Sequence, residues 1–227
     1  MATDGSTRRD AGFGHHEVGV SDDAVAGSAA AAVVHRLAQR HETLATVESL
    51  TGGLLAASIV DVAGVSAIYR GGLVVYATDL KDSLAGVPAD LLSERGPVDP
   101  DVAAALAEGG RERCGADWGV ATTGVAGPEP QDGKPVGLVY VAVAGANGAE
   151  VRHLDLDGGR EHVRVTAVIE ALRLLAERIY DVDAQEALPG APTADPDTPE
   201  VVPPPETSRT PTGTPPGRAG TTGAGHR

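Results

Sequence analysis

Residues 46–53 read TVESLTGG, and this stretch decides the fold of the chain. It follows an apolar, β-branched run at 43–47 and precedes a helical pattern of apolar and small residues at 54–60. This order predicts a strand, a tight turn and the start of a helix. Ser49 lies in the turn, close to where the first N–H groups of a helix lack partners and attract anions. Its hydroxyl is either a nucleophile beside an oxyanion site or an N-cap of the helix.

The regions on both sides of this stretch alternate between strand and helix patterns. An Asn-Gly pair at 147–148 predicts a hairpin turn between the last two strands. The expected elements are helix 23–40, strand 43–48, helix 51–62, strand 68–77, short helices 78–85 and 88–94, helix 100–114, strand 117–123, strands 137–144 and 150–156, and helix 159–180. This alternation with one late hairpin predicts an α/β domain, a three-layer α/β/α sandwich with a mixed, mostly parallel sheet.

Composition divides the 227 residues into three segments. Residues 1–21 are polar and without periodicity, which predicts a disordered N-terminal segment. Residues 22–183 carry the strand and helix patterns and form the predicted folded domain. Residues 184–227 contain ten of the sixteen prolines and few large apolar residues, so they cannot bury enough surface to offset their chain entropy. They are predicted to be a disordered Pro/Thr/Gly-rich tail, and a proline-rich docking motif for a partner is the alternative.

The bulk chemistry of the chain excludes several classes of protein. The 18 basic and 32 acidic residues give a net charge of −14, which repels the phosphate backbone of nucleic acids. The single cysteine rules out an internal disulfide and a cysteine-based metal cluster. No apolar run reaches the length of a membrane span, and residues 1–23 lack the apolar segment of a signal peptide. We therefore expect a cytoplasmic protein that binds neither nucleic acid nor a membrane, while a small anionic substrate is compatible with a local basic pocket.

Four clusters of chemically useful side chains lie where predicted strands end, which is where open α/β sheets gather ligands. They are residues 48–53, Tyr76 with Lys81, residues 122–128 and residues 158–164. No histidine lies in the first three clusters, so Lys81 is the candidate base for a nucleophilic Ser49. A lysine in a partly dry pocket has a lowered pKa and can accept a proton. A solvated Lys81 is the alternative, and Glu48 is then the next candidate base.

Tyr76 and two arginines complete the set of candidate residues. Tyr76 either relays a proton or donates a hydrogen bond to a developing oxyanion, or it packs in the core at the end of its strand. Arg160 and Arg164 are spaced i,i+4 at the start of the last helix, which suits a phosphate or a carboxylate. Surface pairing of these arginines with Glu161 or Asp157 is the alternative.

Taken together, the clusters resemble the CinA C-terminal domain family, the nicotinamide-nucleotide amidohydrolases. The matching blocks follow the family's order over residues 25–180: ESxTGG at 48–53, GGLVVY at 71–76 with Lys81, TGxAGP at 123–128, KPVGLVY at 134–140 and GRxxVR at 159–164. The chain departs from the family pattern at Leu50, where a cysteine is common, at Thr78, where an asparagine is common, and in a shorter loop at 129–133. With residues 1–21 before the fold, it resembles the stand-alone form of the family, without the molybdopterin-binding-like domain.

The resemblance implies hydrolysis of the carboxamide of nicotinamide mononucleotide to nicotinate mononucleotide and ammonia, by a homodimer that needs no metal or cofactor. The family's serine, tyrosine and lysine fall on Ser49, Tyr76 and Lys81. The substrate-binding residues expected are Thr51, Gly52, Gly53, Thr123, Gly124 and Arg160, with the glycines offering backbone N–H groups. The alternative is a catalytically weak nucleotide-binding module that regulates a partner. The two hypotheses differ in whether Lys81 and Tyr76 converge on Ser49 in one pocket.

Overall fold

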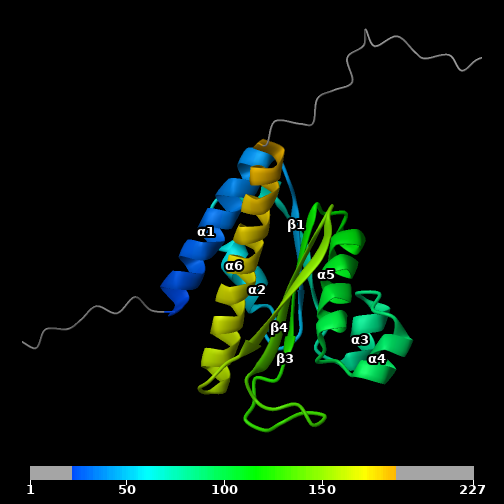
Figure 1. The fold of residues 1–227 in the computed structure, drawn as a ribbon. Coiled ribbons are helices and arrows are strands. Elements are labelled where there is room, and N and C mark those ends of the chain that lie inside the picture. The colour runs from blue at the N-terminus through cyan, green and yellow to red at the C-terminus, as the bar shows by residue number, and fades with distance from the viewer. Residues whose placement is uncertain (1–21, 188–227) are drawn as a thin grey trace, which may run out of the picture. The chain divides into compact units, whose positions relative to one another are not determined.

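The computed structural model describes residues 22–187, which form a five-stranded sheet with helices on both faces (Figure 1). The elements are α1 (Asp22–Arg40), β1 (Leu44–Glu48), α2 (Leu54–Val60), the 3₁₀ turn η1 (Val65–Ala67), β2 (Tyr69–Val74), α3 (Thr78–Ser83), α4 (Ala89–Arg95), α5 (Pro100–Cys114), β3 (Trp118–Gly124), β4 (Leu138–Gly145), β5 (Gly148–Asp155) and α6 (Arg160–Ala187). Every helix and strand predicted from the sequence is present, with ends shifted by at most three residues except at the end of α6. The predicted disordered segments at 1–21 and from 188 onward lie outside the described residues.

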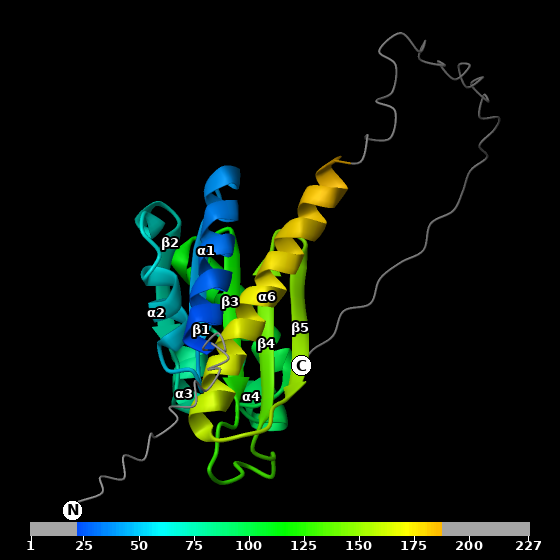
Figure 2. The same cartoon turned by 90° about the vertical axis from the view of Figure 1, so that its left-hand side faces the viewer.

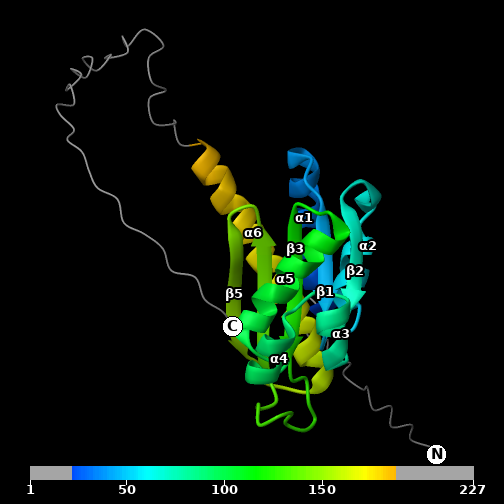
Figure 3. The same cartoon turned by 90° about the vertical axis from the view of Figure 1, so that its right-hand side faces the viewer.

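The sheet has the strand order β2-β1-β3-β4-β5. β1 pairs in parallel with both β2 and β3, whereas the β3–β4 and β4–β5 pairs are antiparallel. Four of the strands therefore point the same way, and β4 runs against them. Helices α1, α2 and α6 lie on one face (Figure 2), and α3, α4 and α5 lie on the other (Figure 3). This arrangement confirms the predicted three-layer sandwich with a mixed, mostly parallel sheet.

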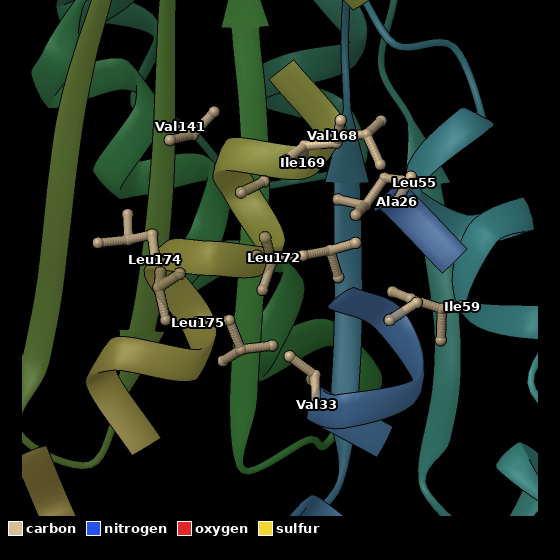
Figure 4. Close-up of a cluster of buried hydrophobic side chains, with 14 of the residues drawn as sticks. Ala26, Val33, Leu55, Ile59, Val141, Val168, Ile169, Leu172, Leu174 and Leu175 are labelled. Carbon is tan, nitrogen blue, oxygen red and sulfur yellow. The ribbon is translucent and has the colours of Figure 1, made fainter. Parts of the chain in front are cut away.

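The larger core lies between the sheet and the layer formed by α1, α2 and α6 (Figure 4). Buried side chains recur every three or four residues along α6, as expected of a helix that packs one face on a sheet. Those in the core are Val163, Ala167, Val168, Ile169, Ala171, Leu172, Leu174, Leu175 and Ile179. They hold α6 along most of its length, so its first turn is fixed at the edge of the sheet. Among residues 22–187, no helix is both long and apolar enough to cross a membrane.

The opposite face is packed with small side chains, as the low aromatic content of 3% requires. A Cβ atom added to Gly110 of α5 would lie 2.3 Å from a methyl group of Val47. One added to Gly119 of β3 would lie 2.0 Å from the carbonyl oxygen of Ala107. Helix α5 therefore approaches the sheet more closely than any residue with a side chain would allow at these two positions.

Helix α6 is longer than the sequence predicts. It continues to Ala187, past the expected helix end at 180 and into the segment 184–227 that was predicted to be tail. Residues 184–187 read AQEA, and all three residue types are strong helix formers. Arg36 and Arg40 of α1 both bind the Asp183 carboxylate, which ties this last part of α6 to α1. Residues 184–187 therefore belong to α6 and not to the predicted tail.

The sheet also explains where a site can form. β1, β2 and β3 are parallel, so their carboxyl ends meet at one edge, together with the loop after β3 and the start of α6 (lower edge in Figure 1). Side chains alternate along a strand, and in β1 Leu44 packs toward α1 and α6 whereas Val47 packs toward α5. Continuing this alternation, Glu48 faces the α2 side and Ser49 faces the α3 side.

Candidate active site

Ser49 directly follows β1 at the edge where the parallel strands end. Its N–H donates to the carbonyl oxygen of Thr122 at 3.0 Å, so the pairing with β3 continues through it. The residue is buried, with 8% of its surface exposed. Helix α2 begins only at Leu54, and its N-cap residue is Gly53, in the left-handed conformation. Ser49 therefore does not cap α2, and the interpretation of its hydroxyl as an N-cap is wrong.

The N-terminus of α2 is capped instead by Glu48, a role that the sequence analysis missed. Its buried carboxylate accepts hydrogen bonds from the N–H groups of Gly53, Leu55 and Ala56, at 2.8 to 3.0 Å. Both oxygens are used, and they satisfy N–H groups that a helix start leaves without partners. One signal was available in the sequence: Gly52 and Gly53 stand directly before the apolar helical pattern, and they have no side chain that can cap a helix.

Replacing Glu48 with alanine is expected to lower the free energy of unfolding by roughly 3 kcal/mol or more. Three N–H groups lose their acceptor, one of them buried and two part-buried, and an unpaired buried group costs about 1–3 kcal/mol. Glu48→Gln keeps one carbonyl oxygen and should lose less. Urea unfolding followed by Trp118 fluorescence measures both variants, with Glu161→Ala on the surface of α6 as the control. A Glu48→Ala variant as stable as the parent would show that the cap contributes nothing.

Lys81 reaches Ser49 from α3. Its Nζ lies 3.1 Å from Ser49 Oγ and 2.8 Å from the Val75 carbonyl oxygen, and it donates to both. The side chain is 1% exposed, and this burial lowers the pKa of Lys81 to about 8 because the charged form loses its hydration. The alternative of a solvated Lys81 is therefore wrong. A buried amine with a lowered pKa, in contact with a serine hydroxyl, is the arrangement that proton transfer from that serine needs.

Tyr76 and Arg160 meet at the rim of the site. Arg160, the first residue of α6, donates from Nη2 to Tyr76 Oη at 3.1 Å and from Nη1 to the Gly127 carbonyl oxygen at 2.7 Å. Tyr76 is 59% exposed, so the alternative that it packs in the core is wrong. The alternative of surface pairing also fails for Arg160, which within residues 22–187 binds Tyr76 and Gly127 and neither Glu161 nor Asp157.

A cavity of about 90 Å³ opens beside these groups. Its walls include Ser49, Lys81, Tyr76, Thr123, Gly124 and Arg160. The three predicted catalytic residues and three of the six predicted substrate-binding residues thus share one cavity. Lys81 and Arg160 bring two positive charges to it against the single carboxylate of Glu129, which favours an anionic ligand on an otherwise acidic protein. In the part of the chain that the structure describes, no group of three His, Cys, Asp or Glu side chains is placed to hold a metal ion.

Thr123 and Gly124 form the part of the cavity wall that comes from the end of β3. Thr123 is buried, and its hydroxyl donates to the Pro97 carbonyl oxygen at 2.6 Å. This contact ties β3 to the segment before α5. A Cβ atom on Gly124 would lie 2.6 Å from the Leu138 carbonyl oxygen, so only glycine fits there. Thr123 therefore shapes the cavity through its side chain, and Gly124 through the close approach of its backbone.

The other three predicted substrate-binding residues, Thr51, Gly52 and Gly53, are not among the residues that line the cavity. The Thr51 hydroxyl instead contacts that of Thr122 at 2.8 Å on the α2 side of the sheet. The N–H groups of Gly52 and Gly53 were expected to bind substrate oxygens. They donate to the Ser49 carbonyl oxygen and to the Glu48 carboxylate, so neither is free. Residues 51–53 therefore support the site from the α2 side of the sheet and do not form part of the cavity wall.

Comparison with known proteins agrees with the family resemblance of the sequence blocks between residues 25 and 180. The family model of the CinA C-terminal domain matches residues 26–179. The chain belongs to this family. It is 48% identical over 168 residues to a CinA-like protein of Frankia casuarinae, a match that covers 74% of the chain and 38% of the relative. It is 45% identical over 149 residues to a CinA-like protein of Geobacter sulfurreducens, covering 65% of the chain and 36% of the relative. The chain thus spans well under half the length of these curated relatives.

Solved structures of the CinA superfamily have the same fold. A superfamily protein of Klebsiella pneumoniae superposes with a TM-score of 0.67 at 30% identity, covering 69% of the chain and 98% of that protein. The competence/damage-inducible protein CihA of Agrobacterium tumefaciens gives 0.65 at 33% identity, covering 69% and 96%. Because nearly the whole of each solved chain is matched, the similarity extends over the complete sandwich.

Proposed function

We propose that this protein hydrolyses the carboxamide of nicotinamide mononucleotide to nicotinate mononucleotide and ammonia. The observation that carries the proposal is the 3.1 Å contact between Lys81 Nζ and Ser49 Oγ at the wall of the cavity. Membership of the CinA C-terminal domain family supports the choice of substrate through the resemblance of the sequence blocks. The Arg160 guanidinium in the cavity wall suits a substrate that carries a phosphate.

The first half of the reaction forms an ester on Ser49. Neutral Lys81 takes the proton of Ser49 Oγ as that oxygen attacks the carboxamide carbon, giving a tetrahedral intermediate. Lys81, now an ammonium, returns the proton to the amide nitrogen, and the C–N bond breaks with release of ammonia. Tyr76 Oη accepts a hydrogen bond from Arg160, which leaves its own proton available for an oxygen of the substrate.

The second half regenerates the enzyme. A water molecule attacks the ester carbon while Lys81 takes one of its protons, and the bond to Ser49 Oγ then breaks. Lys81 gives the proton to Oγ, and the carboxylate product leaves. The same amine therefore acts as base and acid in turn in each half, which is the behaviour expected of a group whose pKa lies near the working pH.

The rest of the substrate would lie toward the rim. A cavity of about 90 Å³ has room for a carboxamide end but not for a whole nucleotide, so the ribose phosphate extends outward. Arg160 stands at that rim with a planar guanidinium, a group that binds phosphate through two hydrogen bonds at once. We therefore assign the phosphate contact to Arg160.

Replacing Arg160 with alanine is expected to raise the Michaelis constant for nicotinamide mononucleotide at least tenfold and to change kcat much less. A phosphate anchor binds the ground state and the transition state alike, so its loss weakens binding without slowing the chemical step. Steady-state kinetics measure both constants, with Arg173→Ala as the control because Arg173 lies on the same helix and pairs with Glu170 on the surface. A fall in kcat at constant Michaelis constant would instead give Arg160 a role in the chemistry through Tyr76.

The rival hypothesis, a regulatory nucleotide-binding module without significant activity, is less well supported. A binding module does not need a basic group in contact with the serine hydroxyl. Lys81 is buried in that position, although burial removes the hydration of its charged form. Tyr76 lines the same cavity as both of them. Buried amines beside a hydroxyl are typical of sites that move protons.

The decisive experiment is incubation of the purified chain with nicotinamide mononucleotide. Ammonia and nicotinate mononucleotide are expected in equal amounts, with Ser49→Ala as the inactive control and free nicotinamide as a poor substrate that lacks the phosphate. If the folded protein binds the nucleotide in calorimetry but releases no ammonia, the regulatory module is the better description.

A further inference from the structure

We infer that Arg164 is a positioning residue that holds the backbone turn after Ser49 in its reactive geometry. The inference rests on the proposed use of Ser49 as a nucleophile. Arg164 Nε donates to the Leu50 carbonyl oxygen at 3.0 Å, and its Nη2 donates to the Thr51 carbonyl oxygen at 2.6 Å. The side chain is partly buried and is not among the residues that line the cavity. The spacing of Arg160 and Arg164 predicts a shared anion site, but the two arginines have different tasks.

The two contacts fix the orientation of consecutive peptide groups. In a trans peptide the C=O and the following N–H point in opposite directions. With the Leu50 carbonyl turned toward Arg164, the N–H of Thr51 points away from it. Within residues 22–187, the N–H groups of Leu50 and Thr51 have no hydrogen-bond acceptor in the structure, although both residues are buried. Unpaired buried N–H groups are rare, and of these two residues Leu50 lines the cavity. Its N–H group is therefore the donor available to the oxyanion that forms beside Ser49, and Arg164 holds the carbonyl oxygen of the same residue.

The turn is held by opposite charges at its two ends. Behind Ser49, the Glu48 carboxylate binds N–H groups from Gly53 onward, and the Arg164 guanidinium binds the carbonyl oxygens that precede them. A guanidinium suits this task because its N–H groups lie in one plane with fixed directions, so it can bind two carbonyl groups at once. A lysine at 164 would keep the charge but not the two directed contacts.

The test compares Arg164→Ala and Arg164→Lys with the surface control Arg173→Ala. Both Arg164 variants are expected to lose about a hundredfold in kcat, the usual cost of a misplaced donor or a displaced reacting group. The Michaelis constant should change little, and the midpoint of the pH profile should stay near that of the parent, because Arg164 contacts neither Lys81 nor the cavity. Added guanidinium ion, at a concentration too low to denature, should restore part of the kcat of Arg164→Ala and none of that of Arg164→Lys.

A second readout separates this inference from the proposed function. Methanesulfonyl fluoride sulfonylates an activated serine with loss of fluoride, and mass spectrometry gives the rate of labelling at Ser49 without any nucleotide. We expect slower labelling in Arg164→Ala than in the parent, with recovery on adding guanidinium ion. If the parent labels rapidly but does not hydrolyse nicotinamide mononucleotide, the substrate is wrong and the role of Arg164 stands. Labelling at parental rate in Arg164→Ala overturns the inference, as does a rise in the Michaelis constant with kcat unchanged.

Discussion

Replacing Lys81 with methionine is expected to lower kcat by about two to four orders of magnitude, the usual range for the loss of an acid–base group. Methionine keeps the bulk of the stem and fills the buried space, so the change removes the amine with little disturbance of packing. The amine is the group that contacts Ser49 Oγ, and no other side chain among the described residues forms a hydrogen bond with this hydroxyl. Ammonia release under saturating substrate measures the loss.

The pH profile of the parent should carry the signature of the same amine. Burial lowers the pKa of Lys81 to about 8, so above that value the amine is neutral and can accept the Ser49 proton. Below it the ammonium predominates, and kcat/KM should fall about tenfold for each pH unit. At pH 7 about one tenth of the enzyme would be in the active form, against less than one in a thousand for a lysine with the ordinary value near 10.4.

Two outcomes would count against this assignment of the base. One is near-parental turnover in Lys81→Met with an unchanged pH profile. Lys134→Met is the control, because it removes a lysine outside the cavity. The other is a parental profile without a midpoint near pH 8. Glu48, the alternative base suggested by the sequence, is a poor substitute because its two oxygens already accept three hydrogen bonds from α2.

The fold could be predicted from the sequence because its signals are local and repeat. Strand and helix periodicity, the glycine turn after Ser49 and the Asn-Gly hairpin at 147–148 each specify an element without reference to the rest of the chain. The edge where the site forms then follows, since parallel strands end together. The end of α6 was missed because a composition shift toward proline hides the helix-forming AQEA stretch at 184–187 and the contact between Asp183 and α1.

The site was harder to predict, because its chemistry depends on which face a side chain occupies and what buries it. The sequence offers the lysine but not its 1% exposure, and from the sequence alone a solvated Lys81 was therefore the favoured interpretation. Thr51, Gly52 and Gly53 looked like ligand-binding residues because a glycine turn before a helix often presents free N–H groups. Here Glu48 and the Ser49 carbonyl take up the glycine N–H groups, and that contact depends on the alternation of side chains along β1.

Replacing Ser49 with alanine is expected to abolish ammonia release while leaving the fold intact. The hydroxyl is the proposed nucleophile, and no other hydroxyl contacts Lys81 Nζ among the described residues. Loss of a helix cap would cost about 1 kcal/mol at any pH, but Ser49 does not cap α2.

The stability that Ser49→Ala loses relative to the parent should instead depend on pH. This dependence distinguishes a hydrogen-bond partner of Lys81 from a helix cap. The variant removes an acceptor from the Lys81 ammonium, whose hydrogen bonds are worth about 1.5–3 kcal/mol. At pH 6 Lys81 is charged in both the folded and the unfolded state, so the full loss should appear. As the pH rises through about 8 the folded-state amine becomes neutral, and the difference from the parent should shrink. Urea unfolding at pH 6 and pH 9.5 measures it. An equal loss at both values, together with near-parental ammonia release, would make Ser49 a structural residue and leave the reaction without its nucleophile.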